Sequence, residues 1–284
     1  VSGVEFSVEN TGFLHLFPNK GGILVTLHVD GTRLAFISCH LTAHEGVKHC
    51  EERNASIAEI FGGVRAGDER FDVSEQFHHV FWMGDMNYRT TYDTKHMPSS
   101  TKKNVKELNA AAKVKEDAQT KAGPSAAKKE TPLTAVLNED PESGSDSDEE
   151  PAGKGGDKEK KKKEWKEQHR RTMEMVVGEK WSDILALDEL NREIAAERVL
   201  NGFTALQPSF PPTFKRTRQA VILPTHSADA KGKKWDTRLD GNDPLHSVAT
   251  FYHPKRIPSF TDRILFKSQP TFRGNLRNYF FESC

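Results

Sequence analysis

The segment Trp82–Arg89 places an acid, an amide and a cation directly after a short apolar run. Asp85 and Asn87 are two residues apart, so both side chains would lie on one face if the strand stays extended. A carboxylate beside an amide can hold a water molecule and remove its proton, as hydrolysis at phosphorus requires. Gly84 would let backbone or ligand approach closely. The alternative, favoured for this segment alone, is a turn in which both side chains bond local backbone.

Two other segments could bring positive charge or a proton donor to such a site. His40 ends a strand-like run and could contact a phosphate or act as an acid. For a single histidine, a hydrogen-bonded place at a strand edge is the commoner role. Lys20 lies in the glycine-rich turn 19–22, which lacks the spacing of a Walker loop.

The third segment, Lys255–Leu265, has two cations before a proline turn and an acid-base pair entering a strand. Arg256 could bind phosphate oxygens through paired hydrogen bonds. The alternative is a basic surface loop in which Asp262 and Arg263 hold a turn. Both alternatives stay open from the residues alone.

Local patterns predict the elements that must position these residues. Ile23–Val29 and Arg33–Ser38 flank an Asp-Gly pair, which is typical of a β-hairpin. Val80–Met83 has the apolar character of a buried strand. Strands and helices intermix, which predicts an α/β or α+β fold with a substantial sheet. The other predicted elements are helices at Glu51–Phe61 and Trp181–Val199 and strands at Val248–Tyr252 and Ile264–Phe266.

Composition excludes several classes of protein. The 284 residues carry 41 Lys and Arg against 41 Asp and Glu, a net charge of zero, which argues against bulk nucleic-acid binding. The three cysteines are too few for a disulfide scaffold and indicate a reducing compartment. With no long apolar run and no visible leader, we expect a cytoplasmic protein that could be peripheral on membranes.

A low-complexity segment explains the low mean hydropathy of −0.68. Residues 98–165 hold an acidic run, Ser143–Glu150, and a basic run, Lys158–Lys163. Such a segment cannot bury enough apolar surface to offset its ordering entropy, so we predict a disordered insert. It would separate residues 1–97 from 166–284, two parts of one domain. The basic run could touch anionic lipid or nucleic acid, but a solvated linker is favoured.

Together these segments resemble the inositol polyphosphate 5-phosphatases of the DNase I-like endonuclease/exonuclease/phosphatase superfamily. The resemblance covers about residues 12–97 and 172–284. It implies a four-layer sandwich in which two β-sheets are flanked by helices. The matching motifs are Asn19–Gly22, Ser38–His44 with Glu52–Asn54, Phe81–Arg89, Trp181–Leu190, Phe210–Lys215 and Arg256–Leu265.

The resemblance implies a Mg²⁺-dependent phosphatase that hydrolyses the 5-phosphate of a phosphoinositide lipid or a soluble inositol phosphate, with no nucleic-acid partner. Asp85 would activate the attacking water, and Asn87 would position that water and the phosphate. His40 would contact the phosphate, and Arg89 would support the site.

Further residues would bind the substrate. Lys215 and Arg256 would contact the 4-phosphate of the inositol ring, and Lys20 would have a weak role. Asp262 and Arg263 would shape the pocket wall.

The family's Gln-Glu element, whose glutamate binds Mg²⁺, is not found in residues 1–18, and its Ser-Asp-His element is not found after Leu265. The metal ligand is therefore expected outside this chain, and residues 1–284 alone are expected to have little activity. A phosphodiesterase or nuclease of the same fold is the rival enzyme. A catalytically inactive binding domain is the rival outside catalysis.

Overall fold

The computed structural model describes residues 1–11, 19–93, 155–216, 252–253, 255–279 and 281–282. The chain divides into two units. The first unit joins segments from before and after the predicted insert. That 1–97 and 166–284 form one domain stays a prediction. The first unit comprises Val1–Thr91, Asp188–Phe210 and Phe260–Cys284, and the second comprises Tyr92–Leu187 and Pro211–Ser259.

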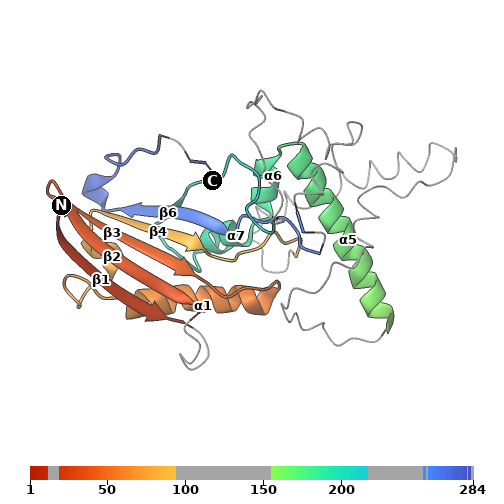
Figure 1. The fold of residues 1–284 in the computed structure, drawn as a ribbon, viewed down its shortest axis with the longest axis horizontal. Coiled ribbons are helices and arrows are strands. Elements are labelled where there is room, and N and C mark those ends of the chain that lie inside the picture. The colour runs from red at the N-terminus through yellow and green to blue at the C-terminus, as the bar shows by residue number, and fades with distance from the viewer. Residues whose placement is uncertain (12–18, 94–154, 217–251, 254, 280, 283–284) are drawn as a thin grey trace, which may run out of the picture. The chain divides into compact units, whose positions relative to one another are not determined.

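The first unit is built on a six-stranded sheet with the strand order β1-β2-β3-β4-β6-β5 (Figure 1). Neighbouring strands are antiparallel except β3 and β4, which are parallel. This confirms the predicted α/β class with a substantial sheet. The strands are β1 (Ser2–Asn10), β2 (Gly21–Val29), β3 (Thr32–His40), β4 (His79–Asp85), β5 (Thr204–Ala205) and β6 (Asp262–Ser268).

The predicted hairpin is confirmed, and it fixes the register of the site. Asp30 and Gly31 have φ angles of 46° and 78°. Positive φ at both central residues is what a type I′ turn needs, and its twist matches that of the flanking strands. The resulting register places Gly21 opposite His40 at the far end of the pair.

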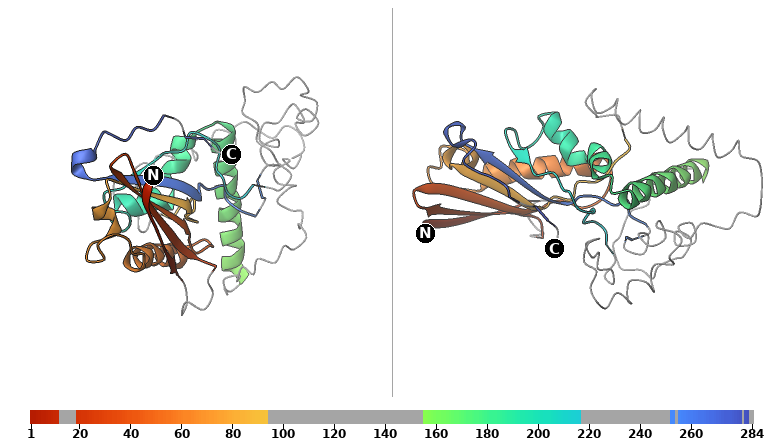
Figure 2. Two further views of the ribbon diagram at one scale, coloured as in Figure 1. Left: turned by 60° about the vertical axis from the view of Figure 1, so that its left-hand side comes forward. Right: turned by 90° about the horizontal axis from the view of Figure 1, so that it is seen from above.

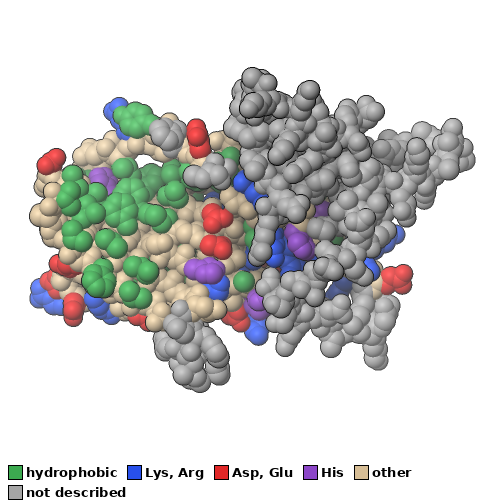
Figure 3. Space-filling model, viewed as in Figure 1, with side chains coloured by type: hydrophobic (Ala, Val, Ile, Leu, Met, Phe, Trp, Pro, Cys, Tyr) green, Lys and Arg blue, Asp and Glu red, His purple; other side chains and the backbone are tan. Residues whose placement is uncertain are grey.

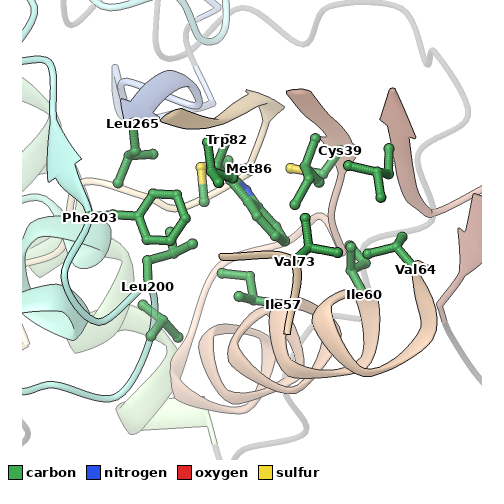
Figure 4. Close-up of a cluster of buried hydrophobic side chains, with 14 of the residues drawn as sticks. Cys39, Ile57, Ile60, Val64, Val73, Trp82, Met86, Leu200, Phe203 and Leu265 are labelled. Atoms are coloured by element: carbon green, nitrogen blue, oxygen red, sulfur yellow. The ribbon is translucent and has the colours of Figure 1, made fainter. Parts of the chain in front are cut away.

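Helix α1 (Val47–Gly63) lies along one face of this sheet (Figures 1 and 2). It contains the predicted helix at Glu51–Phe61. Ile57 and Ile60 are buried against side chains of the sheet, among them Trp82 (Figure 4). Burial of this apolar face stabilises the layer by the hydrophobic effect. Two short elements complete this unit, helix α2 (Val73–Gln76) and the 3₁₀ turn η2 (Pro270–Phe272).

The opposite face of the sheet is also apolar, and it is open among the described residues (Figure 3). Phe6 is 78% exposed and Ile23 is 50% exposed. Beside them, Phe36 and Phe81 stack with ring centroids 4.9 Å apart. A sheet that is apolar on both faces is typical of one buried between two layers. The exposed apolar face is thus compatible with the predicted sandwich, of which the described residues contain one sheet.

Helix α5 (Gly155–Val177) corrects part of the predicted insert. Residues 155–165 are helical rather than disordered, while 98–154 lie outside the described residues. Lysine and glutamate have high helix propensity, and acid-base pairs three or four residues apart support the helix. One such pair joins Arg171 Nε to Glu167 at 2.6 Å. Helix propensity and side-chain pairing therefore make this polar stretch helical despite its low apolar content.

The predicted helix Trp181–Val199 is two helices, α6 (Trp181–Ala186) and α7 (Glu189–Ala195). Asp188 begins the second helix by accepting a hydrogen bond from the Asn191 amide at 2.9 Å. Aspartate is a favoured N-cap residue, and its extended backbone interrupts the apolar periodicity. Of the predicted strand Val248–Tyr252, residues 248–251 lie outside the described residues.

The described cysteines are structural. Cys39 and Cys50 are free and buried, and burial raises the pKa of each thiol to about 12. Neither is therefore a thiolate near neutral pH. Among the helices that the structure describes, none has the length and apolar character needed to span a membrane.

Candidate active site

A row of functional side chains crosses one edge of the sheet. The register pairs Gly21 with His40, His40 with Asp85, and Asp85 with Asp262. Strands β3 and β4 end at this edge and β6 begins there, so three polar residues occupy neighbouring strands. Figure 3 shows acidic, histidine and basic side chains gathered beside the apolar face. The sheet thus brings together residues up to 222 positions apart, from His40 to Asp262.

Gly84 allows strands β3 and β4 to approach each other closely at this edge. Its φ of 130° is disfavoured for residues that carry a Cβ. An added Cβ would lie 2.0 Å from the carbonyl oxygen of Cys39 on the neighbouring strand. The predicted close approach at this glycine is confirmed, and the approaching group is backbone.

Lys20, His40 and Asp85 form a contiguous polar group. Lys20 Nζ lies 2.6 Å from His40 Nε2, which lies 3.7 Å from Asp85 Oδ2. The short distance between the two nitrogens is that of a side-chain hydrogen bond. Burial lowers the pKa of Lys20, the negative charge of Asp85 opposes that shift, and Arg89 adds to it. Lys20 therefore lies beside His40 at the site, although only a weak substrate role was predicted for it.

Asp85 has the electrostatic surroundings of a base. Its pKa is raised, first by burial and then by the negative charge of Asp262. His40, the backbone amide of Asn87 and Arg89 act in the opposite direction. The side chain is still 39% exposed, so a water molecule can reach it. A carboxylate with a raised pKa accepts a proton more readily than an ordinary aspartate.

Asp262→Asn should shift the pH dependence of activity in the full-length protein. Removing this negative charge lowers the pKa of Asp85. A base must be deprotonated to act, so the acid limb of kcat/KM should move to lower pH. Asp30→Asn makes the same charge change at the hairpin turn, at the other end of β2 and β3, and should leave the limb in place. An acid limb that Asp262→Asn leaves unmoved or shifts upward would contradict the coupling.

Asn87 does not continue the strand, which corrects the predicted extended geometry. Its φ is 56°, and its backbone amide donates to Asp85 Oδ1 at 3.1 Å. The turn that was the alternative for this segment is therefore present. The Asn87 side chain is 3% exposed, donating to Leu41 O at 2.9 Å and accepting from Arg89 Nη2 at 2.8 Å. These bonds fix Asn87 behind Asp85 and tie both to the loop that follows His40.

A buried ion pair supports the segment that carries Asn87 and the loop that follows His40. Arg53 is fully buried, and its Nη2 donates to Glu189 Oε2 at 2.7 Å. Its Nη1 donates to the carbonyl oxygens of Thr42 and His44 at 3.2 and 2.9 Å. The same Glu189 oxygen accepts from the backbone amide of Arg89 at 2.9 Å. Glu189 therefore links the loop after His40 to the segment that carries Asn87.

Arg53 and Glu189 were missed as functional residues, although both lie in motifs that match the family. Burial raises the pKa of Glu189, whereas the charge of Arg53 opposes that shift. The one sign of this role in the sequence is that each is a charged residue inside a stretch with helical apolar periodicity. Nothing in the sequence showed that two such charges, 136 residues apart, would meet.

Arg263 lies on the other side of β6 from Asp262, because successive side chains of a strand alternate. It is buried and donates to Asp188 Oδ2 at 2.6 Å and to Asn191 Oδ1 at 3.0 Å. Its guanidinium holds α7 to the sheet. Arg263 is therefore a structural ion-pair partner of Asp188, contrary to its predicted place in the pocket wall. Asp262 is exposed at the edge, and its predicted place in the pocket wall stays a prediction.

Lys215 and Arg256 belong to the second unit, where two backbone segments bring them together. His253 N donates to Lys215 O at 2.8 Å, and Arg256 N donates to His253 O at 3.1 Å. Phe214 and Ser259 exchange backbone hydrogen bonds of 3.0 and 2.9 Å. Both predicted phosphate contacts are partly exposed. The sequence separates them by 41 residues, so their pairing is a product of the fold.

The oxygen ligands at the sheet edge suit a hard metal cation, but they are few. Asp85 and Asp262 supply carboxylate oxygens, the ligands that Mg²⁺ prefers. Among the described residues, no group of three or more His, Cys, Asp or Glu side chains is arranged to hold a metal ion. The two carboxylates therefore fit Mg²⁺ by ligand type and would need further ligands.

Known proteins are similar to parts of this chain. A phosphatidylinositol 3,4,5-trisphosphate 5-phosphatase 2A of Danio rerio is 36% identical over 96 residues, 33% of this chain and 7% of that protein. The human phosphatidylinositol 3,4,5-trisphosphate 5-phosphatase 2 is 36% identical over 96 residues, 33% of this chain and 8% of its own length. The matched part thus spans less than a tenth of these relatives.

A solved structure of the inositol polyphosphate 5-phosphatase domain of SPsynaptojanin, in complex with inositol (1,4)-bisphosphate and calcium ion, is 19% identical. Its TM-score is 0.49, with 94% of this chain and 47% of that chain covered. The model of endonuclease/exonuclease/phosphatase family 2 matches residues 1–134 and 160–283. With most of its length matched in this way, the chain belongs to endonuclease/exonuclease/phosphatase family 2, and its resemblance to the inositol polyphosphate 5-phosphatases is confirmed.

Proposed function

We propose that the whole protein is a phosphatase that removes the 5-phosphate from phosphoinositides or inositol polyphosphates by direct attack of water. The observation that carries this proposal is the solvent-accessible row at the sheet edge. It places the carboxylate of Asp85, with its raised pKa, beside His40 and Lys20. A base next to a cation is what an attack on a negatively charged phosphate requires.

Asp85 and the residues around it each have a role in this reaction. Asp85 accepts the proton of the attacking water. Lys20 places positive charge where the phosphate oxygens gather charge, and His40 orients Lys20 through their hydrogen bond. Asn87 is held by Arg89 and Leu41 O, so it keeps the backbone behind Asp85 in place. The backbone that carries Asp85 is therefore held in place, while the carboxylate itself is open towards solvent.

Magnesium is part of the proposal. Asp85 and Asp262 would contribute oxygen ligands, together with ligands from outside residues 1–284. When bound, the ion would neutralise phosphate charge and lower the pKa of a bound water. We further propose a cytoplasmic protein that works at membranes when its substrate is a lipid.

The test is the release of inorganic phosphate by the full-length protein. With Mg²⁺ present, we expect hydrolysis of a 4,5-bisphosphorylated inositol compound and none of a nucleic-acid or sphingolipid phosphodiester. Cleavage of the phosphodiester alone would favour the rival enzyme of the same fold. Binding without turnover of any substrate would favour the inactive binding domain. The zero net charge of the chain gives no support to nucleic acid as substrate.

Arg256→Ala should impair hydrolysis of substrates that carry a 4-phosphate. The substitution removes a charge-assisted hydrogen bond, worth about 1.5–3 kcal/mol in kcat/KM. A substrate with only the 5-phosphate should be nearly insensitive. Lys255→Ala removes the neighbouring exposed cation and is the matched control, with little expected effect on either substrate. If Arg256→Ala weakened both substrates equally, Arg256 would be a structural residue of its loop.

A further inference from the structure

The N-terminal half of helix α5 exposes four consecutive lysines, Lys160–Lys163, here called the lysine collar. Consecutive residues of an α-helix are about 100° apart, so four of them surround the helix. Among the described residues, none forms an ion pair with the collar. Later cations of the same helix differ, because Arg170 pairs with Glu167 at 2.8 Å and Arg171 with Glu167 at 2.6 Å. The charges of the collar thus have no partner among the described residues.

The other half of α5 is packed. Met173 is fully buried, His169 is 1% exposed, and Thr172 Oγ1 lies 3.0 Å from Tyr92 Oη. These contacts hold the helix in the second unit through its C-terminal half. The collar has no buried face of its own, so packing does not account for its residues. A helix that is polar all round needs another source of stability.

The four charges of the collar repel one another. Like charges on neighbouring positions of a helix destabilise it, by Coulomb repulsion between them. An anionic surface would offset this repulsion and so stabilise the collar in its helical form. The collar is complementary to such a surface in side-chain charge.

We propose that the lysine collar docks the protein on an anionic membrane surface. Lysine is a compact point charge that suits the diffuse negative potential of lipid headgroups. A nucleic acid would be expected to draw on a wider basic surface, but the net charge of the chain is zero. This inference rests on the proposed function and deepens it, because docking would favour a lipid substrate over a soluble inositol phosphate.

The binding test uses the full-length protein and vesicles of phosphatidylcholine with and without phosphatidylserine. Replacing all four collar lysines with Gln keeps helix propensity and removes four charges. Each lysine at an anionic surface contributes about fivefold, and roughly two of the four can face it at once. We therefore expect about thirtyfold weaker binding to the phosphatidylserine vesicles. Raising the salt concentration should weaken wild-type binding and change the variant little.

The matched control removes four exposed cations from other elements. Lys48, Lys180, Arg273 and Arg277 are all exposed, and changing all four to Gln gives the same net charge. This control should bind the vesicles nearly as tightly as the wild type. Equal loss in both variants would overturn docking at the collar and leave only a general charge effect. Vesicle binding that the collar variant retains, with loss of binding to a DNA or RNA oligonucleotide instead, would overturn the membrane assignment.

Turnover assays distinguish a failure of this inference from a failure of the proposed function. The collar variant should lose turnover of a phosphoinositide embedded in phosphatidylserine vesicles. Its turnover of a soluble inositol trisphosphate should stay within about twofold of wild type, because the collar holds no catalytic residue. Equal turnover of the embedded lipid by variant and wild type would refute docking. Hydrolysis of neither substrate by the wild type would refute the proposed function, while vesicle binding would still decide on the collar.

Discussion

Asp85→Asn is expected to lower kcat of the full-length protein by about a hundredfold or more, as removal of a general base typically does. The amide keeps the size of the side chain and can still accept the hydrogen bond from the Asn87 backbone amide. It cannot accept the proton of the attacking water at neutral pH. The effect should therefore fall on kcat, as measured by steady-state release of inorganic phosphate.

The fold of this variant should be intact. Asp85 is partly exposed and has a raised pKa, so the folded protein gains little from its charge. We expect a melting temperature within a few degrees of wild type. A folded Asp85→Asn protein with kcat within about threefold of wild type would exclude Asp85 as the base.

Arg53→Met should cause the largest loss of stability. The guanidinium is fully buried and bonded to Glu189 and to the backbone of Thr42 and His44. Removing it leaves the buried Glu189 carboxylate without its closest charge partner. Breaking a buried pair in this way costs about 3–5 kcal/mol in the free energy of unfolding, measurable by urea denaturation.

Two further variants distinguish a pair effect from a loss of packing. The double change Arg53→Met and Glu189→Met removes both charges and should recover much of the stability, because no uncompensated charge remains. Lys48→Met breaks an exposed pair, Lys48 Nζ to Glu52 Oε1 at 3.8 Å, on the same helix. This control should cost about 0.5 kcal/mol or less. If Arg53→Met cost no more than the control, the pair would not hold the site.

Elements with strong local signals could be predicted from the sequence. The turn at Asp30 and Gly31 requires positive φ at two residues, and this is a local property of the chain. Strand β4 follows from an apolar run that ends in Gly84 and Asp85. The residues of the sheet edge were found because chemistry at strand ends is visible in sequence. The sequence could not show that His40, Asp85 and Asp262 occupy one register row, because register is set between strands.

Two of the corrections arise from contacts between segments far apart in the sequence. Asn87 leaves the extended conformation because its side chain bonds Leu41 O and Arg89. Arg263 turns inward because Asp188, 75 residues earlier, lies beneath β6. Helix α5 has a local cause, because helix propensity and i,i+4 pairing make a stretch of polar composition helical. Long-range polar contacts were therefore the main source of error.

The most direct test of the central claim is the position of the phosphate that the protein removes. The full-length protein would be incubated with Mg²⁺ and inositol 1,4,5-trisphosphate, and the product identified by phosphorus NMR, with Asp85→Asn as the control. The account predicts that wild type leaves inositol 1,4-bisphosphate and that the control leaves the substrate essentially unchanged. Loss of the 4-phosphate before the 5-phosphate, or equal release by Asp85→Asn, would contradict it.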